Sequence, residues 1–157
     1  MDPSPIQIRE ANRSDLSRLL ALYQHLVPDD AVPSRDVASS IFDRFLGYEG
    51  SAIFVGETCG HFVASCTLVV VPNLTRGGSP YGLIENVVTH GDYRKRGCGK
   101  CILDHATTAA WNAGCYKVML MTGSKRPETF KFYLAAGFEQ SKTGFQKRRI
   151  PVRPEGS

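Results

Sequence analysis

The sequence predicts a mixed α/β fold in which about four helices flank a mostly antiparallel sheet of six or seven strands. Two observations indicate this class. Segments with apolar residues at spacings of three and four alternate with extended segments, and three extended segments follow one another in the middle of the chain. The 157 residues contain no internal repeat and no linker, so we expect residues 1–157 to form a single domain.

The N-terminal part is expected to contain one strand and two helices. Residues 6–9 alternate between apolar and polar side chains, as a short strand does. Asn12 or Ser14 can cap a first helix, whose apolar stripe runs through residues 16–27. A proline-bounded break follows, and Ser34 can cap a second helix.

The middle of the chain is expected to form three strands and a long helix. Residues 52–57 and 61–71 are the arms of a hairpin, and residues 81–90 form the fourth strand. A helix opens at Gly97 or Cys98 and reaches about residue 113, where Gly114 is typical of a helix end.

The C-terminal part is expected to complete the sheet. Residues 116–122 form a fifth strand, and residues 127–135 form a short helix that ends before Gly137. Residues 138–140 and 145–150 then form a closing pair of strands.

Composition indicates a cytoplasmic protein. The first residues lack the basic and apolar segments of a signal peptide, and no apolar run is long enough to cross a bilayer. Five cysteines, an odd number without framework spacing, fit reduced thiols better than a disulfide scaffold. The net charge of +4 is mild, and we expect neither a membrane nor a nucleic-acid partner.

A glycine-containing basic loop is the sharpest local feature. Residues 94–100 read Arg-Lys-Arg-Gly-Cys-Gly-Lys and stand between a predicted strand and a predicted helix. The first turn of a helix offers backbone N–H groups without intrahelical partners and a partial positive charge, and glycines let an anion come close. Neither a three-glycine dinucleotide fingerprint nor a Walker motif is present, so the loop alone is equally consistent with a phosphate site and an ordinary turn.

The stretch from Ile84 to Phe138 resembles the GNAT superfamily of N-acetyltransferases. Residues 94–99 match the family signature [QR]-x-x-G-x-[GA], and residues 132–138, Phe-Tyr-Leu-Ala-Ala-Gly-Phe, match its F-Y-x-x-x-G-F motif. The resemblance implies that the fourth and fifth strands splay apart and that the pantetheine arm of acetyl-CoA lies between them. One departure is that Arg126 and Thr129 replace the Asn and Ala found before the Phe-Tyr pair in many members.

The resemblance also implies roles for particular residues. Tyr133 corresponds to a tyrosine that protonates the departing thiolate in many members, and Arg126 is a candidate phosphate contact. The residues expected to bind the cofactor, first along the pantetheine and thioester and then around the pyrophosphate, are Val87, Val88, Thr89, Arg94, Lys95, Arg96, Gly97, Cys98, Gly99 and Lys100.

Glu85 is the candidate general base. By alternation it shares a strand face with Leu83, Val87 and Thr89, so its carboxylate interrupts a largely apolar strand. The alternative is that Glu85 forms an ion pair at the sheet edge. His90 is a rival base, although a histidine at a strand end is more often a cap.

Two other features have competing interpretations. Asp29 and Asp30 lie where family members close over the substrate, but an acidic loop is usually only solvated. Cys98 and Cys101 form a C-x-x-C at a helix start, which permits an acidic thiol but overlaps the glycine signature.

We therefore expect an acetyl-CoA-dependent N-acetyltransferase that uses no metal and acts by direct attack of a small-molecule or peptide amine. The glucosamine-phosphate acetyltransferases are a closer resemblance, carried by the fourth strand and by residues 115–118. A non-catalytic acyl-CoA sensor is the alternative from another class. A homodimer is expected because the closing strands often build one in this family.

Overall fold

The computed structural model describes residues 4–152, which divide into two compact units with a boundary between Leu120 and Met121. The first unit contains a five-stranded sheet in the order β1-β2-β3-β4-β5. The strands are β1 (Gln7–Glu10), β2 (Ala52–Thr58), β3 (His61–Val71), β4 (Tyr81–Thr89) and β5 (Val118–Met119). All pairs are antiparallel except β4 with β5, which is parallel. The expected mixed, mostly antiparallel sheet is confirmed.

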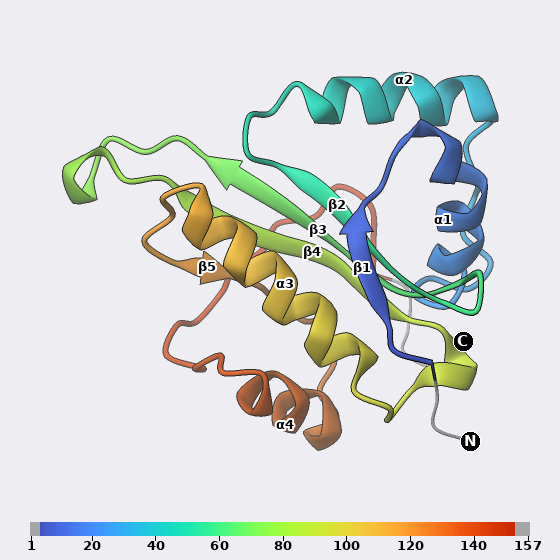
Figure 1. The fold of residues 1–157 in the computed structure, drawn as a ribbon. Helices are drawn as coiled ribbons and strands as arrows, with labels where there is room; N and C mark the ends of the chain where they lie inside the picture. Colours follow the sequence, from blue (N-terminus) through green and yellow to red (C-terminus); the bar gives the residue numbers. More distant parts are fainter. Residues whose placement is uncertain (1–3, 153–157) are drawn as a thin grey trace. The chain divides into compact units, whose positions relative to one another are not determined.

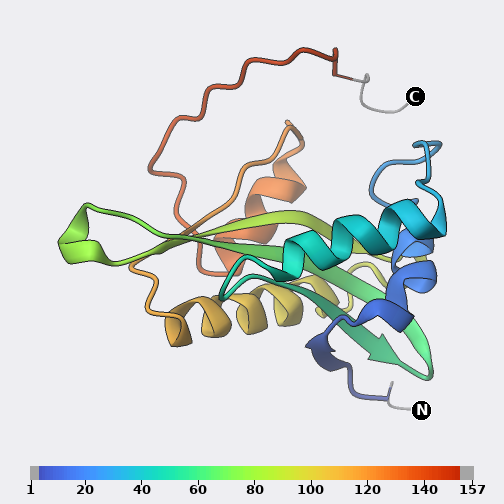
Figure 2. The same cartoon turned by 90° about the horizontal axis from the view of Figure 1, so that it is seen from above.

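Helices cover both faces of this sheet (Figures 1 and 2). The helices α1 (Leu16–Tyr23) and α2 (Arg35–Leu46) lie on one face, and α3 (Cys98–Asn112) lies on the other. Three 3₁₀ turns stand between the larger elements: η1 (Arg13–Asp15), η2 (Arg76–Gly78) and η3 (Gly91–Tyr93). With α4 in the second unit, this confirms the expected number of four α-helices.

The two faces of the sheet carry separate apolar cores. Phe54 and Val55 are neighbours in β2 and point to opposite faces, as successive strand residues do. The Phe54 ring packs edge-on against His105 of α3 at 4.9 Å, whereas Val55 belongs to the core beneath α1 and α2. That second core consists of Ala11, Leu16, Leu19, Leu22, Ala38, Phe42, Val55, Phe62 and Val88.

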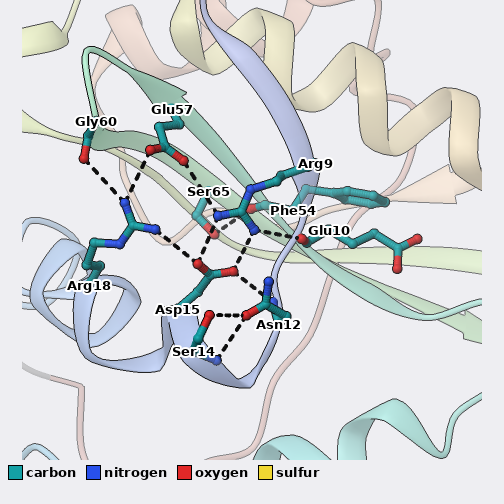
Figure 3. Close-up of polar contacts among 10 residues, drawn as sticks. All are labelled: Arg9, Glu10, Asn12, Ser14, Asp15, Arg18, Phe54, Glu57, Gly60 and Ser65. Atoms are coloured by element: carbon teal, nitrogen blue, oxygen red, sulfur yellow. Dashed lines mark hydrogen bonds and ion pairs between the residues drawn. The ribbon is translucent and has the colours of Figure 1, made fainter.

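A charged network fixes the start of α1 to the sheet (Figure 3). The Asp15 side chain is 1% exposed and accepts hydrogen bonds from Arg9 at 2.6 and 2.9 Å and from Arg18 at 3.1 Å. Its third donor is the backbone N–H of Asn12 at 2.8 Å, which completes a capping box. Arg9 and Arg18 also contact Glu57 of β2, so α1 and the β1–β2 edge share one set of ion pairs.

Several element ends differ from the sequence prediction. The first helix ends at Tyr23, and the chain continues in turns. Leu26 and Val27, which the sequence predicted on its apolar stripe, lie beyond the helix and are exposed. The cap by Ser34 is confirmed: its hydroxyl accepts the Val37 N–H at 3.3 Å. The hairpin, fourth strand and α3 lie within a residue or two of their predicted limits, and Gly114 has a φ of +83° just after α3.

The predicted fifth strand is mostly wrong. Of residues 116–122 only Val118 and Met119 form a strand, because their parallel pairing with Gly82 and Leu83 extends no further. The sheet therefore has five strands among the described residues instead of six or seven.

The second unit contains α4 (Pro127–Ala135) and the chain that follows it. The helix begins with proline at its first position and has the predicted limits. The two closing strands predicted at residues 138–140 and 145–150 are absent, and this segment is exposed without strand pairing as far as residue 152. Alternating side chains alone do not make a strand, because a strand requires a partner for its backbone.

Candidate active site

The fourth strand contains a distortion at its centre. Glu85 pairs with Thr67 of β3 and Val88 pairs with Ser65, so β4 has one residue more than β3 between these two pairs. Asn86, inside the bulge, has a φ of +51°, a left-handed conformation that asparagine tolerates better than most residues. Such bulges re-aim side chains and recur next to active sites.

The bulge changes which residues share a face with Glu85. Simple alternation places Val87 and Thr89 beside it, and that expectation is wrong. The extra residue shifts the parity, so Glu85 lies on the same face as Val88, which belongs to the core beneath α1 and α2. Glu85 itself is exposed and forms no ion pair within residues 4–120, so the alternative of a sheet-edge ion pair is absent there.

Hydroxyl groups surround the position opposite Glu85. Thr67, its cross-strand partner, is 8% exposed, and Ser65 is fully buried and donates to the Phe54 carbonyl at 2.7 Å. Tyr23 of α1 faces both hydroxyls. Burial raises the pKa of the Tyr23 phenol, while the hydroxyls of Thr67 and Ser65 act to lower it. The apolar core is thus interrupted by polar groups at the level of the bulge.

β4 and β5 pair only briefly. Their ladder contains Gly82 with Val118 and Leu83 with Met119, while β4 continues to Thr89. Within residues 4–120, the backbone of β4 beyond Leu83 therefore has a strand partner on its β3 side alone. A strand edge of this kind presents N–H and C=O groups to an extended ligand.

The basic glycine loop leads directly into α3. Gly97 occupies the N-cap position with a φ of +81° and ψ of 0°, and a Cβ there meets no atom within 4 Å, so the space in front of the helix is open. Gly97 has no side chain with which to cap the helix, so it leaves the first N–H groups of α3 available to an anion. The neighbours of Gly97 differ in burial: Arg94, Lys95 and Arg96 are exposed, whereas Cys98 and Gly99 are buried.

The cations of this loop are held by different partners. The guanidinium of Arg94 donates to the His25 carbonyl at 3.1 Å, and that of Arg96 lies over the Tyr93 ring at 5.2 Å. The Lys100 ammonium pairs with Asp104 one helical turn later at 2.6 Å. Residues 94–100 thus carry four cations, Arg94, Lys95, Arg96 and Lys100, and all four side chains are exposed to solvent.

Two histidines join α1 to this loop. The His25 and His90 rings lie against each other with centroids 4.0 Å apart and an interplanar angle of 39°. His25 Nδ1 accepts the Gly91 N–H at 3.2 Å, and His90 Nδ1 accepts the Asp92 N–H at the same distance. An Nδ1 that accepts carries no proton, so the hydrogen bond from Gly91 requires the His25 proton to be on Nε2. His90 is a cap of η3, as the more common interpretation of its position predicted.

The histidines line a depression of about 420 Å³ in the first unit. It lies between the end of α1, the β2–β3 turn and η3, and its other lining residues include Arg18, Phe62 and Tyr93. The Arg18 guanidinium stacks on the Phe62 ring at 4.0 Å, so one of its faces is already covered.

Tyr133 lies in the second unit. It is half-buried on α4, where its ring contacts Phe132 at 5.0 Å and Phe138 at 6.3 Å. Arg126 is exposed at the N-cap position of the same helix, where its backbone carbonyl accepts the Thr129 N–H.

The remaining candidates are distributed as follows. Asp29 is exposed with a φ of +63°, and Asp30 is exposed beside it in the loop between α1 and α2. Burial and the neighbouring Cys101 raise the pKa of the Cys98 thiol, which is opposite to the acidic thiol that the C-x-x-C spacing permits. All five cysteines are free thiols.

Sequence reasoning missed two residues of this region, His25 and Asn86. The partner of His25 is 66 residues further along the chain, and no local pattern connects the two. Asn86 carried a weak signal, since asparagine is enriched at positive φ, but alternation across residues 84–88 hid the bulge.

The comparisons with known proteins agree with this architecture. Residues 19–138 match the family model described as "Acetyltransferase (GNAT) family". The chain belongs to the GNAT acetyltransferase family. The expected family and enzyme class are thereby confirmed, and the five-stranded sheet with its divergent β4 and β5 is the family's fold.

Three relatives illustrate the range of similarity. "Glucosamine 6-phosphate N-acetyltransferase" of Trypanosoma brucei brucei is 32% identical over 85% of this chain and 88% of its own. "Putative acetyltransferase from Agrobacterium tumefaciens str. C58" is 46% identical, with a TM-score of 0.86 over 91% of this chain and 99% of its own. The aminoglycoside-modifying enzyme AAC(6')-Iy, solved with the bisubstrate analogue CoA-S-monomethyl-acetylneamine, shares the fold at 21% identity, with a TM-score of 0.78 over 94% and 100% of the two chains.

Two features are absent from the described residues. No helix within residues 4–152 is long and apolar enough to span a membrane. In the same range, no three histidine, cysteine, aspartate or glutamate side chains gather as a metal site requires.

Proposed function

We propose that this GNAT acetyltransferase binds acetyl-CoA and transfers the acetyl group to a primary amine by direct attack. The observation that carries the proposal is the open N-terminus of α3 at Gly97, together with the four exposed cations of residues 94–100. This is the chemistry that binds a pyrophosphate. The CoA analogue held by AAC(6')-Iy supports the choice of ligand.

The residues of β4 and the loop fit the coenzyme in order. Val87, Val88 and Thr89 lie on the part of β4 that has no β5 partner, where backbone groups can pair with the pantetheine amides. The loop residues 94–100 follow directly, and their backbone N–H groups and side chains would hold the pyrophosphate. Arg126, exposed at the start of α4, is the proposed contact for a further phosphate.

Acetyl-CoA supplies an acyl carbon activated by a thioester. The amine attacks with a neutral nitrogen, and a free alkylamine has a pKa near ~10.4, so a proton must leave it at neutral pH. We propose that Glu85, whose carboxylate is exposed beside the bulge, accepts this proton from the amine. As the N–C bond forms and the C–S bond breaks, the Tyr133 phenol donates its proton to the thiolate.

The role of Tyr133 has a direct test. A Tyr133→Phe variant keeps the ring between Phe132 and Phe138 and removes only the hydroxyl. We expect kcat to fall by about a hundredfold, the low end for a general acid, at unchanged Tm. A wild-type kcat would exclude the assignment.

The acceptor we propose to test first is an amino-sugar phosphate, because the 32% identical trypanosomal relative is named for glucosamine 6-phosphate. The test compares release of free CoA thiol with glucosamine 6-phosphate and with glucosamine. Acetylation of the phosphorylated sugar alone supports this acceptor, and acetylation of other amines alone removes it. A non-catalytic acyl-CoA sensor predicts binding without turnover of any amine.

The coenzyme assignment is tested by calorimetric titration of acetyl-CoA. The variant Lys95→Glu/Arg96→Glu reverses two exposed charges of the loop, and Arg35→Glu/Arg44→Glu makes the same charge change on the exposed side of α2. We expect the wild type and the α2 variant to bind acetyl-CoA with micromolar affinity, and the loop variant to bind it about tenfold more weakly or worse. Equal binding by both variants would place the coenzyme elsewhere.

Two properties of the whole protein belong to the proposal. We propose a cytoplasmic location, which five free thiols support. We also propose a homodimer. The strongly exposed Phe145 and Ile150, in a segment without strand partners as far as residue 152, support association of this segment with a second copy.

A further inference from the structure

The depression between α1 and η3 contains groups that the proposed reaction does not use. His25, at the end of α1, is half-buried and lies against His90, just past the end of β4. Both belong to the lining of the same depression, and the loop that they contact leads to Gly97.

Three hydrogen bonds hold residues 91–94, the segment that leads into the basic glycine loop. The N–H groups of Gly91 and Asp92 donate to the Nδ1 atoms of His25 and His90, each at 3.2 Å. The Arg94 guanidinium donates to the His25 carbonyl at 3.1 Å. His25 therefore takes part in two of the three bonds, one through its side chain and one through its backbone.

We infer that His25 is a positioning residue for residues 91–100, the segment that leads to the proposed coenzyme site, and that a neutral imidazole at His25 is required to hold residues 91–94 in place. The inference rests on the proposed coenzyme site at Gly97. Protonation of His25 at Nδ1 places an N–H against the Gly91 N–H and removes that hydrogen bond.

The charges around His25 favour its neutral form. Its pKa is lowered chiefly by burial, and also by His90 and Arg94, while Asp92 opposes them. The other titratable or charged groups of the depression are Arg18 of α1, His61 of β3 and Tyr93 of η3. Because the positioned loop prefers neutral His25, its order is complete above the ordinary histidine pKa of about 6.5 and declines as the pH falls below it.

Substitution by asparagine separates positioning from mere packing. The Asn oxygen can accept the same N–H that Nδ1 accepts, but it does not titrate. His25→Ala removes the acceptor. The double variant His25→Asn/His90→Asn keeps both acceptors but contains neither titrating imidazole. His61→Ala is the matched control, since His61 is an exposed histidine of the same depression.

The experiment measures the acetyl-CoA Kd of the wild type and these three variants between pH 5.5 and 8, after circular dichroism shows that each protein is folded. At pH 8 we expect His25→Ala to bind about three- to tenfold more weakly, the loss of one hydrogen bond, and the other variants to bind as the wild type does. Below pH 6.5 the wild type and His61→Ala should lose affinity more steeply than the double asparagine variant. The coenzyme phosphate also titrates near ~6, but equally for every protein, so the difference between variants is the result.

A second measurement needs no coenzyme. Hydrogen exchange of the Gly91 and Asp92 amides in the free protein at pH 8 reports the anchor itself. His25→Ala should accelerate exchange at Gly91, and the asparagine variant should not. If His25→Ala has the same Gly91 exchange rate and the same acetyl-CoA Kd as the wild type, the inference is wrong. If exchange at Gly91 is faster in His25→Ala but the wild-type protein does not bind acetyl-CoA, His25 still holds residues 91–94 in place and the proposed function is rejected.

Discussion

Asn86 determines how the middle of β4 is presented. With its left-handed φ it absorbs the extra residue of the bulge, so that Glu85 and Val88 lie on the same face of the sheet. Glu85 precedes it and stays exposed, although its cross-strand partner Thr67 is buried. One residue with an unusual backbone conformation thus brings a carboxylate to the surface in the middle of an otherwise apolar strand.

Replacing Glu85 by Gln tests the proposed base at this scale. The substitution keeps size and hydrogen-bonding capacity but removes the proton acceptor, so we expect kcat/KM to fall by about 10²–10⁴ at neutral pH. Activity lost by the variant should return in part as the pH rises, because more of the amine is then neutral. Steady-state kinetics between pH 6 and 9.5 measures both effects.

The control is Glu10→Gln, which makes the same change on the exposed end of β1. It should behave as the wild type. If both variants keep full activity at every pH, Glu85 is not the base and a water chain is the remaining route for the proton.

Among the elements, α1 is tied to the sheet at its N-terminal end by the ion pairs of Asp15, in addition to its apolar packing. Hydrogen bonds from Arg9 are the main reason that the pKa of the Asp15 carboxyl is lowered, to about 2 against the ordinary value of 3.8. The folded state therefore favours the ionised form. The resulting stability is complete above pH 3.8 and is lost as the pH falls through about 2.

We expect Asp15→Asn to lower the free energy of unfolding by about 2 kcal/mol at pH 7, the value of a pKa shift of this size for a buried group. Urea unfolding measures it, and the difference from the wild type should shrink between pH 4 and 2. Asp43→Asn, which breaks the exposed ion pair with Arg13, should cost less than about 1 kcal/mol. Equal losses for the two variants would contradict the role of burial.

The short β4–β5 ladder leaves little room at Gly82. A Cβ added there lies 2.7 Å from a methyl group of Val118 and 3.1 Å from one of Leu68. We expect Gly82→Ala to destabilise the protein by about 1–3 kcal/mol in urea unfolding, as overpacking does. Adding Val118→Ala should recover part of the loss, and a double variant no more stable than Gly82→Ala would show that the contact is not the cause.

At the scale of the whole molecule, sequence and structure agree best where the signal is local. Ser34, the hairpin and the helix behind Gly97 were predictable because caps, turns and periodicity lie within a few residues of one another. The bulge at Asn86 and the contact of His25 with Gly91 were not, since each depends on a partner strand or loop far along the chain. The predicted closing strands failed for the same reason: alternation is local, but pairing is not.

The proposed homodimer can be tested on the same segment. Phe145 and Ile150 are 91% and 74% exposed, and we expect Phe145→Ser/Ile150→Ser to convert a dimer into a monomer in multi-angle light scattering. Trp111→Ser is the control, because Trp111 is a half-exposed aromatic residue of α3. A wild-type protein that is monomeric at high micromolar concentration would refute the dimer.

The brief pairing of β4 with β5 has a consequence for aggregation. An unpaired strand edge attracts the edges of other molecules and is a common start of aggregation. The exposed Glu85 and the twisted backbone at Asn86 stand on this very stretch, where a charge and a bulge both discourage such pairing. Straightening β4 by deleting Asn86 should therefore harm the yield of monodisperse protein as well as its catalysis.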